Sequence, residues 1–389
     1  MFLFICWRKA SKVIERILAI SKKEILQLMR DKRMLFVLFV FPVILLAIFG
    51  YAINFDVHHV KLYVFDQAKS VESRNIVRML GSSSYFDIEG YLSKDSEIKG
   101  VLDTKKAQCV ISFPVDLDKK LNSGQNATVQ ILIDGVDGNT ASLIANYMNS
   151  ATRAYNNKII KEFFSKNGIP IYTPISLETI FWFNPELKST LFLIPGLIAM
   201  ILVITAVISI SLSIVREKER GTIEQIYVSP TKSLELLLGK SIPYSVIGLL
   251  ISASIIIVSH FMFGLTIKGN ILLLLFTTLL FLFAASNLGI FVSSIADSQQ
   301  VAFQIATLMS LLPSVILSGF IFPIESMPAF IQIITNVTPA KFYVVILRDI
   351  LLKGVGLESF WPQTIYLLIF ALVFLLLATI KNKKAEAQL

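Results

Sequence analysis

Long uncharged hydrophobic segments dominate the pattern along the chain and predict membrane-spanning helices. A helix needs about 20 consecutive apolar residues to cross the hydrocarbon core of a bilayer. A soluble core built from six such segments would need amphipathic helices around it, which the pattern does not supply. Only the last segment is short enough to leave a buried core helix as an alternative. The six segments are Leu35–Ile53, Thr190–Val215, Ser241–Phe263, Ile271–Ile295, Ala302–Ile321 and Thr364–Ile380.

A different pattern lies between the first and second segments, over residues 54–189. Short β-rich runs alternate there with helical periodicity, which is typical of a small α/β or α+β domain. We therefore predict a mainly α membrane protein with six transmembrane helices and an α/β domain inserted between spans 1 and 2. The expected strands are Val60–Phe65, Tyr85–Leu92, Ala107–Phe113 and Thr128–Ile133, and the expected helices are Val71–Leu80, Ser96–Thr104 and 140–166.

Composition and charge add an orientation to this pattern. The 389 residues are 54% hydrophobic and only 16% charged, below the roughly 25% charged residues of soluble domains. The net charge of +9 resides in residues 1–34, in the loop 216–240 and in the tail 381–389. The positive-inside rule then predicts both termini and that loop in the cytosol and residues 54–189 outside. Because the basic residues flank spans, they indicate lipid contact and no nucleic-acid partner.

The N-terminal 34 residues predict a basic amphipathic helix on the cytosolic membrane surface, over about 13–32. It is either a simple anchor or a mechanical element. No small-residue cleavage site follows span 1, so we expect span 1 to stay as an anchor and not as a cleaved signal. Cys6 and Cys109 are expected on opposite sides of the membrane. The apolar positions at helical spacing are Ile14, Ile17, Leu18, Ile25, Leu28 and Met29.

Three prolines interrupt the moderately apolar stretch after span 5. Pro323, Pro328 and Pro339 leave helical pieces that are too short to span a bilayer. Such pieces favour a re-entrant or interfacial external hairpin over residues 322–352, and an ordinary external loop is the alternative.

The loop 216–240 combines a helix stop with a new helix start. Gly221 can end the helix of span 2 in a left-handed conformation, and Thr222 with Gln225 forms a capping-box pattern. Ser229-Pro230 then breaks the short helix. The result is either a docking site for a cytosolic partner or a solvated charged loop.

Three stretches in order give the chain a resemblance to a known family. They are KKEILQLMRDKRMLFVLFVFPVILLAIFGYA at 22–52, REKERGTIEQIYVSP at 216–230, and LLPSVILSGFIFPIESMP at 311–328 followed by TPAKFYVVILRDILLKG at 338–354. Together they resemble the membrane subunits of ABC-2-type transporters, in the drug-export-like subgroup with a large extracytoplasmic domain.

The resemblance implies a permease subunit of an ATP-driven exporter in a bacterial inner membrane. Cytosolic ABC ATPase subunits would carry ATP and Mg, with no cofactor in this chain. A second permease, identical or related, would complete the pair, and a periplasmic adaptor is a further candidate partner. Apolar spans favour a hydrophobic or amphipathic drug-like or lipid-like substrate. The residues expected in or beside the ATPase contact are Glu217, Glu219, Arg220, Gly221, Thr222 and Glu224.

Other functional classes find little support in the residues. Gly239-Lys240-Ser241 imitates the end of a nucleotide-binding P-loop, but Leu234 stands where the pattern needs a glycine. The six segments contain no Asp, Glu, Lys or Arg, which argues against ion-coupled transport. His58, His59 and His260 match no hydrolytic motif, so no catalytic or metal-binding residue is predicted. The rivals are a membrane-anchored sensor or adhesion protein and a membrane-embedded enzyme.

Overall fold

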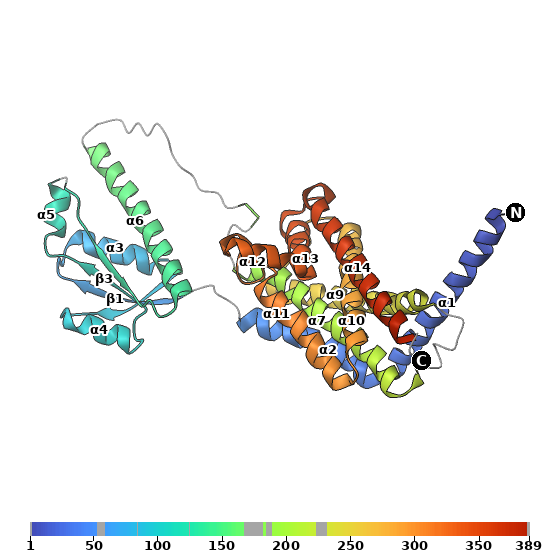
Figure 1. Cartoon of the computed structure of the whole chain (residues 1–389). Coiled ribbons are helices and arrows are strands. Elements are labelled where there is room, and N and C mark those ends of the chain that lie inside the picture. Colours follow the sequence, from blue (N-terminus) through green and yellow to red (C-terminus); the bar gives the residue numbers. More distant parts are fainter. Residues whose placement is uncertain are drawn as a thin grey trace. The chain divides into compact units, whose positions relative to one another are not determined.

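The chain forms two compact units, each with its own core. The computed structural model describes residues 2–52, 59–83, 85–123, 125–166, 182–183, 189–222 and 232–386. The first unit, here the helical unit, comprises Met1–Asn54 and Phe181–Leu389, and the second, the sheet unit, comprises Phe55–Ile180 (Figure 1). Because the sheet unit lies between α2 and α7 in the chain, it is an insertion into the helical unit.

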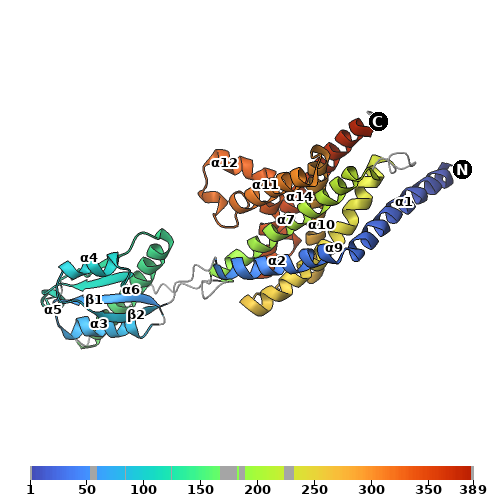
Figure 2. The ribbon, with the colours of Figure 1, turned by 90° about the horizontal axis from the view of Figure 1, so that it is seen from below.

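Six helices of the helical unit are long and apolar enough to cross a membrane, among the described residues. They confirm the six predicted spans. Helix α7 lies at the centre of the unit, because it contacts α2, α9, α10, α11 and α13 (Figure 2). The long helices are α1 (Phe2–Arg30), α2 (Lys32–Ala52), α7 (Ser189–Glu219), α9 (Ser233–Phe263), α10 (Ile271–Ile295), α11 (Gln299–Ile316) and α14 (Leu357–Glu386).

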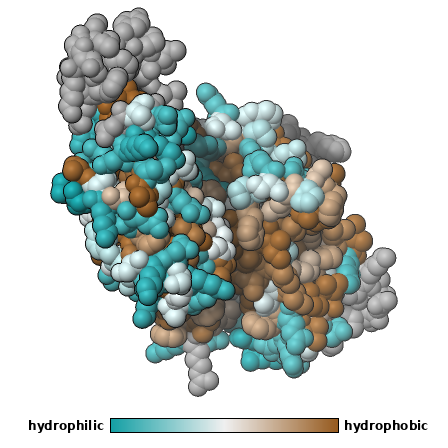
Figure 3. All heavy atoms as spheres, turned by 90° about the vertical axis from the view of Figure 1, so that its left-hand side faces the viewer, coloured by the Kyte–Doolittle hydropathy of each residue, from teal (hydrophilic) through white to brown (hydrophobic). Residues whose placement is uncertain are grey.

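The outer helices keep apolar side chains on the surface. In α7, 72% of the most apolar stretch is buried, whereas the corresponding share in α2, α11 and α14 is 22%. Phe41, Leu308 and Leu376 are among the large apolar residues left exposed on these three helices. Figure 3 shows the resulting broad hydrophobic surface. Such a surface suits a lipid environment, since a monomeric soluble protein rarely exposes one of this kind.

Helix α9 begins earlier than the hydrophobic pattern predicts, at Ser233 and not at Ser241. Its first turns therefore contain Glu235 and Lys240, so the expectation of charge-free spans is wrong for this helix. The helix ends at Phe263, and the next residue, Gly264, caps it in a left-handed conformation with φ of +68°. The additional turns are possible because both charged side chains have partners in the fold.

The sheet unit contains every strand and helix predicted for it, and one further short helix, α5. The strand order is β2-β1-β3-β4, with β1 parallel to β2 and to β3, and β3 antiparallel to β4. Its elements are β1 (Val60–Asp66), α3 (Val71–Gly81), β2 (Phe86–Tyr91), α4 (Ser96–Asp103), β3 (Cys109–Phe113), α5 (Leu117–Asn122), β4 (Gln130–Ile133) and α6 (Gly138–Lys166).

Both faces of the central strands are covered. Leu62 and Ile111 belong to the larger core, which α3 and α6 help to form, whereas Phe65 and Val110 lie in a smaller core with α4. Cys109 is fully buried, and burial raises the pKa of its thiol to about 12. A thiol in this state is inert toward external reagents, because the thiolate is the reactive form.

The prolines of the 322–352 region each stand at the start of a helical piece. Pro323 precedes the 3₁₀ turn η1 (Ile324–Ser326), Pro328 precedes α12 (Ala329–Ile334), and Pro339 is the first residue of α13 (Pro339–Arg348). The 3₁₀ turn η2 (Thr335–Val337) follows α12, and the π-helical turn η3 (Asp349–Lys353) follows α13. The piece Ala329–Val337 and the piece Pro339–Lys353 meet at an angle of 93°. We name residues 322–352 the proline hairpin.

Arg348 ties this hairpin to the spans. Its guanidinium donates to the carbonyl oxygens of Phe192 at 3.3 Å and Gly319 at 3.0 Å and lies 3.8 Å from the centre of the Phe192 ring. Tyr343 is fully buried and its hydroxyl lies 2.7 Å from that of Thr278. The second half of the hairpin is therefore enclosed by protein, as non-spanning backbone at membrane depth requires.

Helix α1 approaches α9 closely because position 239 carries no side chain. A Cβ atom on Gly239 would lie 2.8 Å from Cβ of Ile20, and the hydroxyl of Ser21 donates to the Gly239 carbonyl oxygen at 2.9 Å. Glycine costs a helix about 1 kcal/mol relative to alanine, so its presence here indicates a packing requirement.

The Gly239→Ala variant tests this contact. We expect it to lower the thermal unfolding temperature of the purified protein, because the new methyl group separates α1 from α9. The matched control is Gly100→Ala in α4, where nothing lies within 4 Å of the added Cβ atom. An unfolding temperature of Gly239→Ala equal to or above that of Gly100→Ala would contradict the packing role.

Candidate functional site

Four charged residues from three helices meet inside the helical unit, at the end where α7 stops. Lys240 of α9 places its ammonium 2.6 Å from Oε2 of Glu217 in α7 and 3.0 Å from Oε1 of Glu24 in α1. Lys23 also contacts both carboxylates, with its Nζ 3.2 Å from Oε1 of Glu24 and in close contact with Glu217. We call these four residues the Lys240 cluster.

Three side chains of the Lys240 cluster are buried, whereas that of Lys23 is 47% exposed, and its two lysines balance its two glutamates in charge. The side chains of Lys240 and Glu24 are each 1% exposed, and the hydroxyl of Ser213 donates to Oε2 of Glu24 at 3.1 Å. Burial alone raises the pKa of Glu24, but the ammonium groups of Lys240 and Lys23 outweigh it, so the pKa is lowered overall. Removing one partner of such a buried pair typically costs about 3–5 kcal/mol, because the other charge is left uncompensated.

The face of α1 that packs against the protein is its small and polar face. Ser21, Glu24 and Leu28 are buried, whereas Ile14 and Met29 are 56% and 63% exposed. The predicted amphipathic helix is present, but most of its apolar stripe points away from the other helices. Charge and hydrogen bonding therefore hold α1 in place, and the apolar stripe remains free for a lipid surface.

Further polar contacts surround the cluster and fix the neighbouring helix ends. Arg16 of α1 lies 3.1 Å from Glu235 of α9, and Arg216 lies 3.3 Å from Asp31. Lys218 donates to the carbonyl oxygen of Ser293 in the last turn of α10 at 2.5 Å. A cation at that position complements the negative end of the helix dipole.

The six residues predicted at the ATPase contact fall into different environments. Gly221 has a φ of +68°, so the predicted left-handed end of this helix is confirmed. Glu217 is buried in the Lys240 cluster. Glu219 accepts a hydrogen bond from the backbone nitrogen of Gln299 at 2.7 Å, at the N-terminus of α11. Glu219 and the three residues after it, Arg220, Gly221 and Thr222, are exposed at the end of α7, while Glu224 and the predicted short helix lie outside the described residues.

The tripeptide that imitates a P-loop has three packing roles. Gly239 admits α1, Lys240 joins the charge cluster, and Ser241 donates to Oδ1 of Asn287 at 3.1 Å. Asn287 in turn donates to the carbonyl oxygen of Ala371 at 3.0 Å. The segment thus connects α9 with α1, α10 and α14, and its resemblance to a nucleotide-binding loop is superficial.

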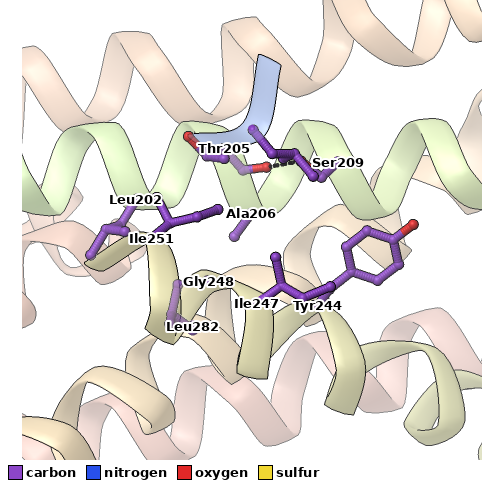
Figure 4. Close-up of a pocket in the computed structure, with 10 residues that line it drawn as sticks. Leu202, Thr205, Ala206, Ser209, Tyr244, Ile247, Gly248, Ile251 and Leu282 are labelled. Atoms are coloured by element: carbon purple, nitrogen blue, oxygen red, sulfur yellow. Dashed lines mark hydrogen bonds between the residues drawn. The ribbon is translucent and has the colours of Figure 1, made fainter. Parts of the chain in front are cut away.

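A small pocket lies between α7 and α9 (Figure 4). Its volume is about 10 Å³, close to the roughly 10–15 Å³ that one water molecule needs. The hydroxyls of Thr205 and Ser209 donate within α7, to the carbonyl oxygens of Ile201 and Thr205. Since the pocket cannot hold a drug-sized molecule, it is not a substrate site in this conformation.

The histidines show no metal chemistry in the described part of the chain. Nδ1 of His59 lies 3.0 Å from Oδ2 of Asp87, and Nδ1 of His260 lies 2.9 Å from the carbonyl oxygen of Leu265. His58 lies outside the described residues. Among the described residues, no group of three or more His, Cys, Asp or Glu residues could hold a metal ion.

The sequence prediction missed Lys240 and Glu24 as members of a site. Lys240 precedes an uncharged segment and therefore resembles an ordinary topological charge. Glu24 stands among basic residues in α1, and its signal is its position on the same helical face as Ser21 and Leu28. Their pairing spans 216 residues of sequence, beyond the reach of local pattern.

The Lys240→Met variant tests the cluster. We expect a loss of about 3–5 kcal/mol of stability, seen as a lower unfolding temperature, because Lys23 alone would remain to balance the charges of Glu24 and Glu217 within the cluster. The double variant Lys240→Met with Glu217→Gln should recover part of the loss. Lys232→Met, at an exposed position before α9, is the control. Equal unfolding temperatures for Lys240→Met and Lys232→Met would refute the energetic role of the cluster.

Comparisons with known proteins identify the family to which the chain belongs. The family model described as ABC-2 family transporter protein matches residues 32–380. The probable multidrug ABC transporter permease YbhS of Escherichia coli is 31% identical over 95% of this chain and 97% of its own length. The permease YbhR of the same organism is 28% identical, over 90% and 93%. ABC transporter G family member 20 of Dictyostelium discoideum is 22% identical over 97% of this chain but 52% of its own length. The match to the family model extends from the start of α2 to the last turns of α14, and the chain belongs to the ABC-2 transporter family.

Proposed function

We propose that this chain is the permease subunit of an ATP-driven exporter whose ATPase is a separate cytosolic subunit. The Lys240 cluster is the observation that carries the proposal. It joins α1, α7 and α9 beside the exposed turn at the end of α7, so a force applied to that turn reaches three helices at once. Separating these helices would be costly, since a buried charge such as that of Lys240 would be left without its partners.

The ATPase would dock on the exposed turn at Arg220, Gly221 and Thr222, together with Glu219 and the undescribed Glu224. Among the described residues, the N-terminal end of α1, the end of α7 and the C-terminal end of α14 all lie at this same end of the helical unit (Figures 1 and 2). Glu217 would act from inside, by holding α7 to α1 and α9. The chain matches only 52% of the length of the Dictyostelium transporter, so the other part of that longer protein has no counterpart in this match.

A second permease would complete the transport path. The pocket between α7 and α9 has room for about one water molecule, so a drug-sized substrate needs another route. Helix α11 is the least apolar of the six spans, is largely unburied and exposes Gln304. A polar residue facing lipid is costly, which favours a partner chain over lipid at this face.

The orientation follows from charge and from the exposed stripe of α1. The basic termini and the turn after α7 would face the cytosol, and α1 would lie in the membrane surface with Ile14, Leu18 and Met29 toward lipid. The sheet unit, inserted between α2 and α7, would then be extracytoplasmic. The relatives YbhS and YbhR are named as probable multidrug ABC transporter permeases, which supports a drug-like substrate. The apolar spans favour a hydrophobic or amphipathic one, and a bacterial inner membrane is the location that we propose.

The Arg220→Glu variant tests the docking turn. We expect it to unfold at the temperature of the unmodified protein, because Arg220 is exposed, but to recover at least about tenfold less ATPase in a mild-detergent purification. Arg153→Glu, an exposed reversal in α6, is the control. Equal ATPase recovery from both variants would exclude Arg220 from the contact, and an unmodified chain that never brings down a P-loop ATPase would refute the proposed function.

Val136→Cys tests the orientation in a Cys6→Ser background. Val136 lies in the sheet unit and is 86% exposed, whereas the native Cys109 is buried and cannot report. A membrane-impermeant maleimide should label the new thiol on intact cells. Lys381→Cys, at an exposed position near the end of α14, should react only after permeabilisation. The reverse pattern would invert the proposed topology.

A further inference from the structure

The sheet unit contains a cavity that is large enough for a small molecule. Its volume is about 350 Å³, within the range of roughly 300–1,000 Å³ that small-molecule sites occupy. It lies on the face of the sheet that α3, α5 and α6 border. Every described residue that lines it belongs to this unit, so the argument for the cavity does not depend on the position of the helical unit.

The floor of the cavity is apolar and deeply buried. Leu80, Ile111, Leu117 and Met148, from four different elements, are each at most 3% exposed. These side chains belong to the larger core of the sheet unit. The cavity is therefore an open edge of that core, and an apolar ligand entering it would continue the core packing.

The rim of the cavity is polar and uncharged. Asn149, Thr152 and Asn156 follow one another at a spacing of three and four residues, so they share a face of α6. The Thr152 hydroxyl is used within the helix, at 2.8 Å from the Met148 carbonyl oxygen. The side-chain amides of Asn149 and Asn156 make no hydrogen bond within the described part of the chain, which leaves donors and acceptors for a ligand.

One wall of the cavity is fixed by a contact between helices. Tyr155 is 7% exposed, and its hydroxyl donates to the carboxylate of Glu72 at the start of α3. This bond holds α6 against α3 at one side of the cavity. No Asp, Glu, Lys or Arg occurs among the described residues that line the cavity. The lining thus disfavours a charged ligand, since a charge entering it would find no partner.

From this floor and rim we propose that the sheet unit binds an uncharged small molecule with an apolar, ring-sized body and a hydrogen-bonding edge. The body would lie against Leu80, Ile111 and Met148, and the polar edge would meet the amides of Asn149 and Asn156. This site is separate from any transport path through the spans. It stands even if the proposed partners of the helical unit are wrong, because it rests on residues of the sheet unit alone.

Photolabelling of the full chain in phosphatidylcholine nanodiscs tests the site. The probe is the neutral 3-trifluoromethyl-3-phenyldiazirine, and mass spectrometry of peptides separates labels in the sheet unit from those on lipid-facing spans. We expect adducts on cavity residues such as Met79 and Met148. Excess N-phenyl-1-naphthylamine, a neutral aromatic competitor, should abolish these adducts.

Ala151→Trp provides the blocked site, because its larger side chain would fill the cavity. Labelling of Met79 and Met148 should fall at least about tenfold, which corresponds to 1.4 kcal/mol in binding free energy, with unchanged labelling of the spans. Ala154→Trp, at an exposed position of the same helix outside the lining, is the matched control. Ala127→Phe blocks the cavity from the β4 side and serves if Ala151→Trp lowers the unfolding temperature.

Three results would overturn the proposal. Adducts in the sheet unit that the competitor does not reduce would show surface reaction without a site. Equal labelling of Met79 and Met148 in both blocking variants and in the control would show that the cavity is not where the probe binds. Absence of any adduct in the sheet unit would mean that the chain itself fills the cavity.

Discussion

The neutralisation of Lys240 by Glu24 and Glu217 is the interaction on which the helical unit depends. A lysine that is 1% exposed can remain charged only with partners at hydrogen-bond distance, and here those partners come from two other helices. The pairing fixes the rotation of α1, the depth of α9 and the end of α7 together. Gly239 allows the close approach that brings the groups within reach. The burial of Leu28 and the contact between Ile20 and Gly239 add packing of α1 to these charge interactions.

Local pattern was sufficient for the elements of both units. The spans were predictable because each is a long uncharged run, and the strands of the sheet unit because β-branched runs alternate with polar turns. The three prolines marked the starts of the short helices correctly, since proline is accepted at the first helical position. Gly221 likewise marked the end of α7. These features depend on a few neighbouring residues, which is why the sequence alone indicates them.

Features that depend on distant residues were not predictable in the same way. The apolar stripe of α1 predicted a helix on the membrane surface, whereas the contacts of Ser21 and Glu24 with other helices were not predictable, because their partners lie far along the chain. Helix α9 begins at Ser233 for the same reason: Glu235 and Lys240 are accepted in it only after α1 is in place. The cavity of the sheet unit depends on how α6 lies on the sheet, which the periodicity of α6 does not encode.

The order in which the chain is synthesised gives the Lys240 cluster a further consequence. Glu24 emerges from the ribosome long before Glu217 and Lys240, which follow only after the whole sheet unit and α7. During that interval α1 lacks its final partners, and Glu24 has neither Lys240 nor Ser213 beside it. The docking of α1 is then a late event in biogenesis. A chain truncated before α9 would lack Gly239 and Lys240, so α1 would lose both its close contact with α9 and its charge pairing.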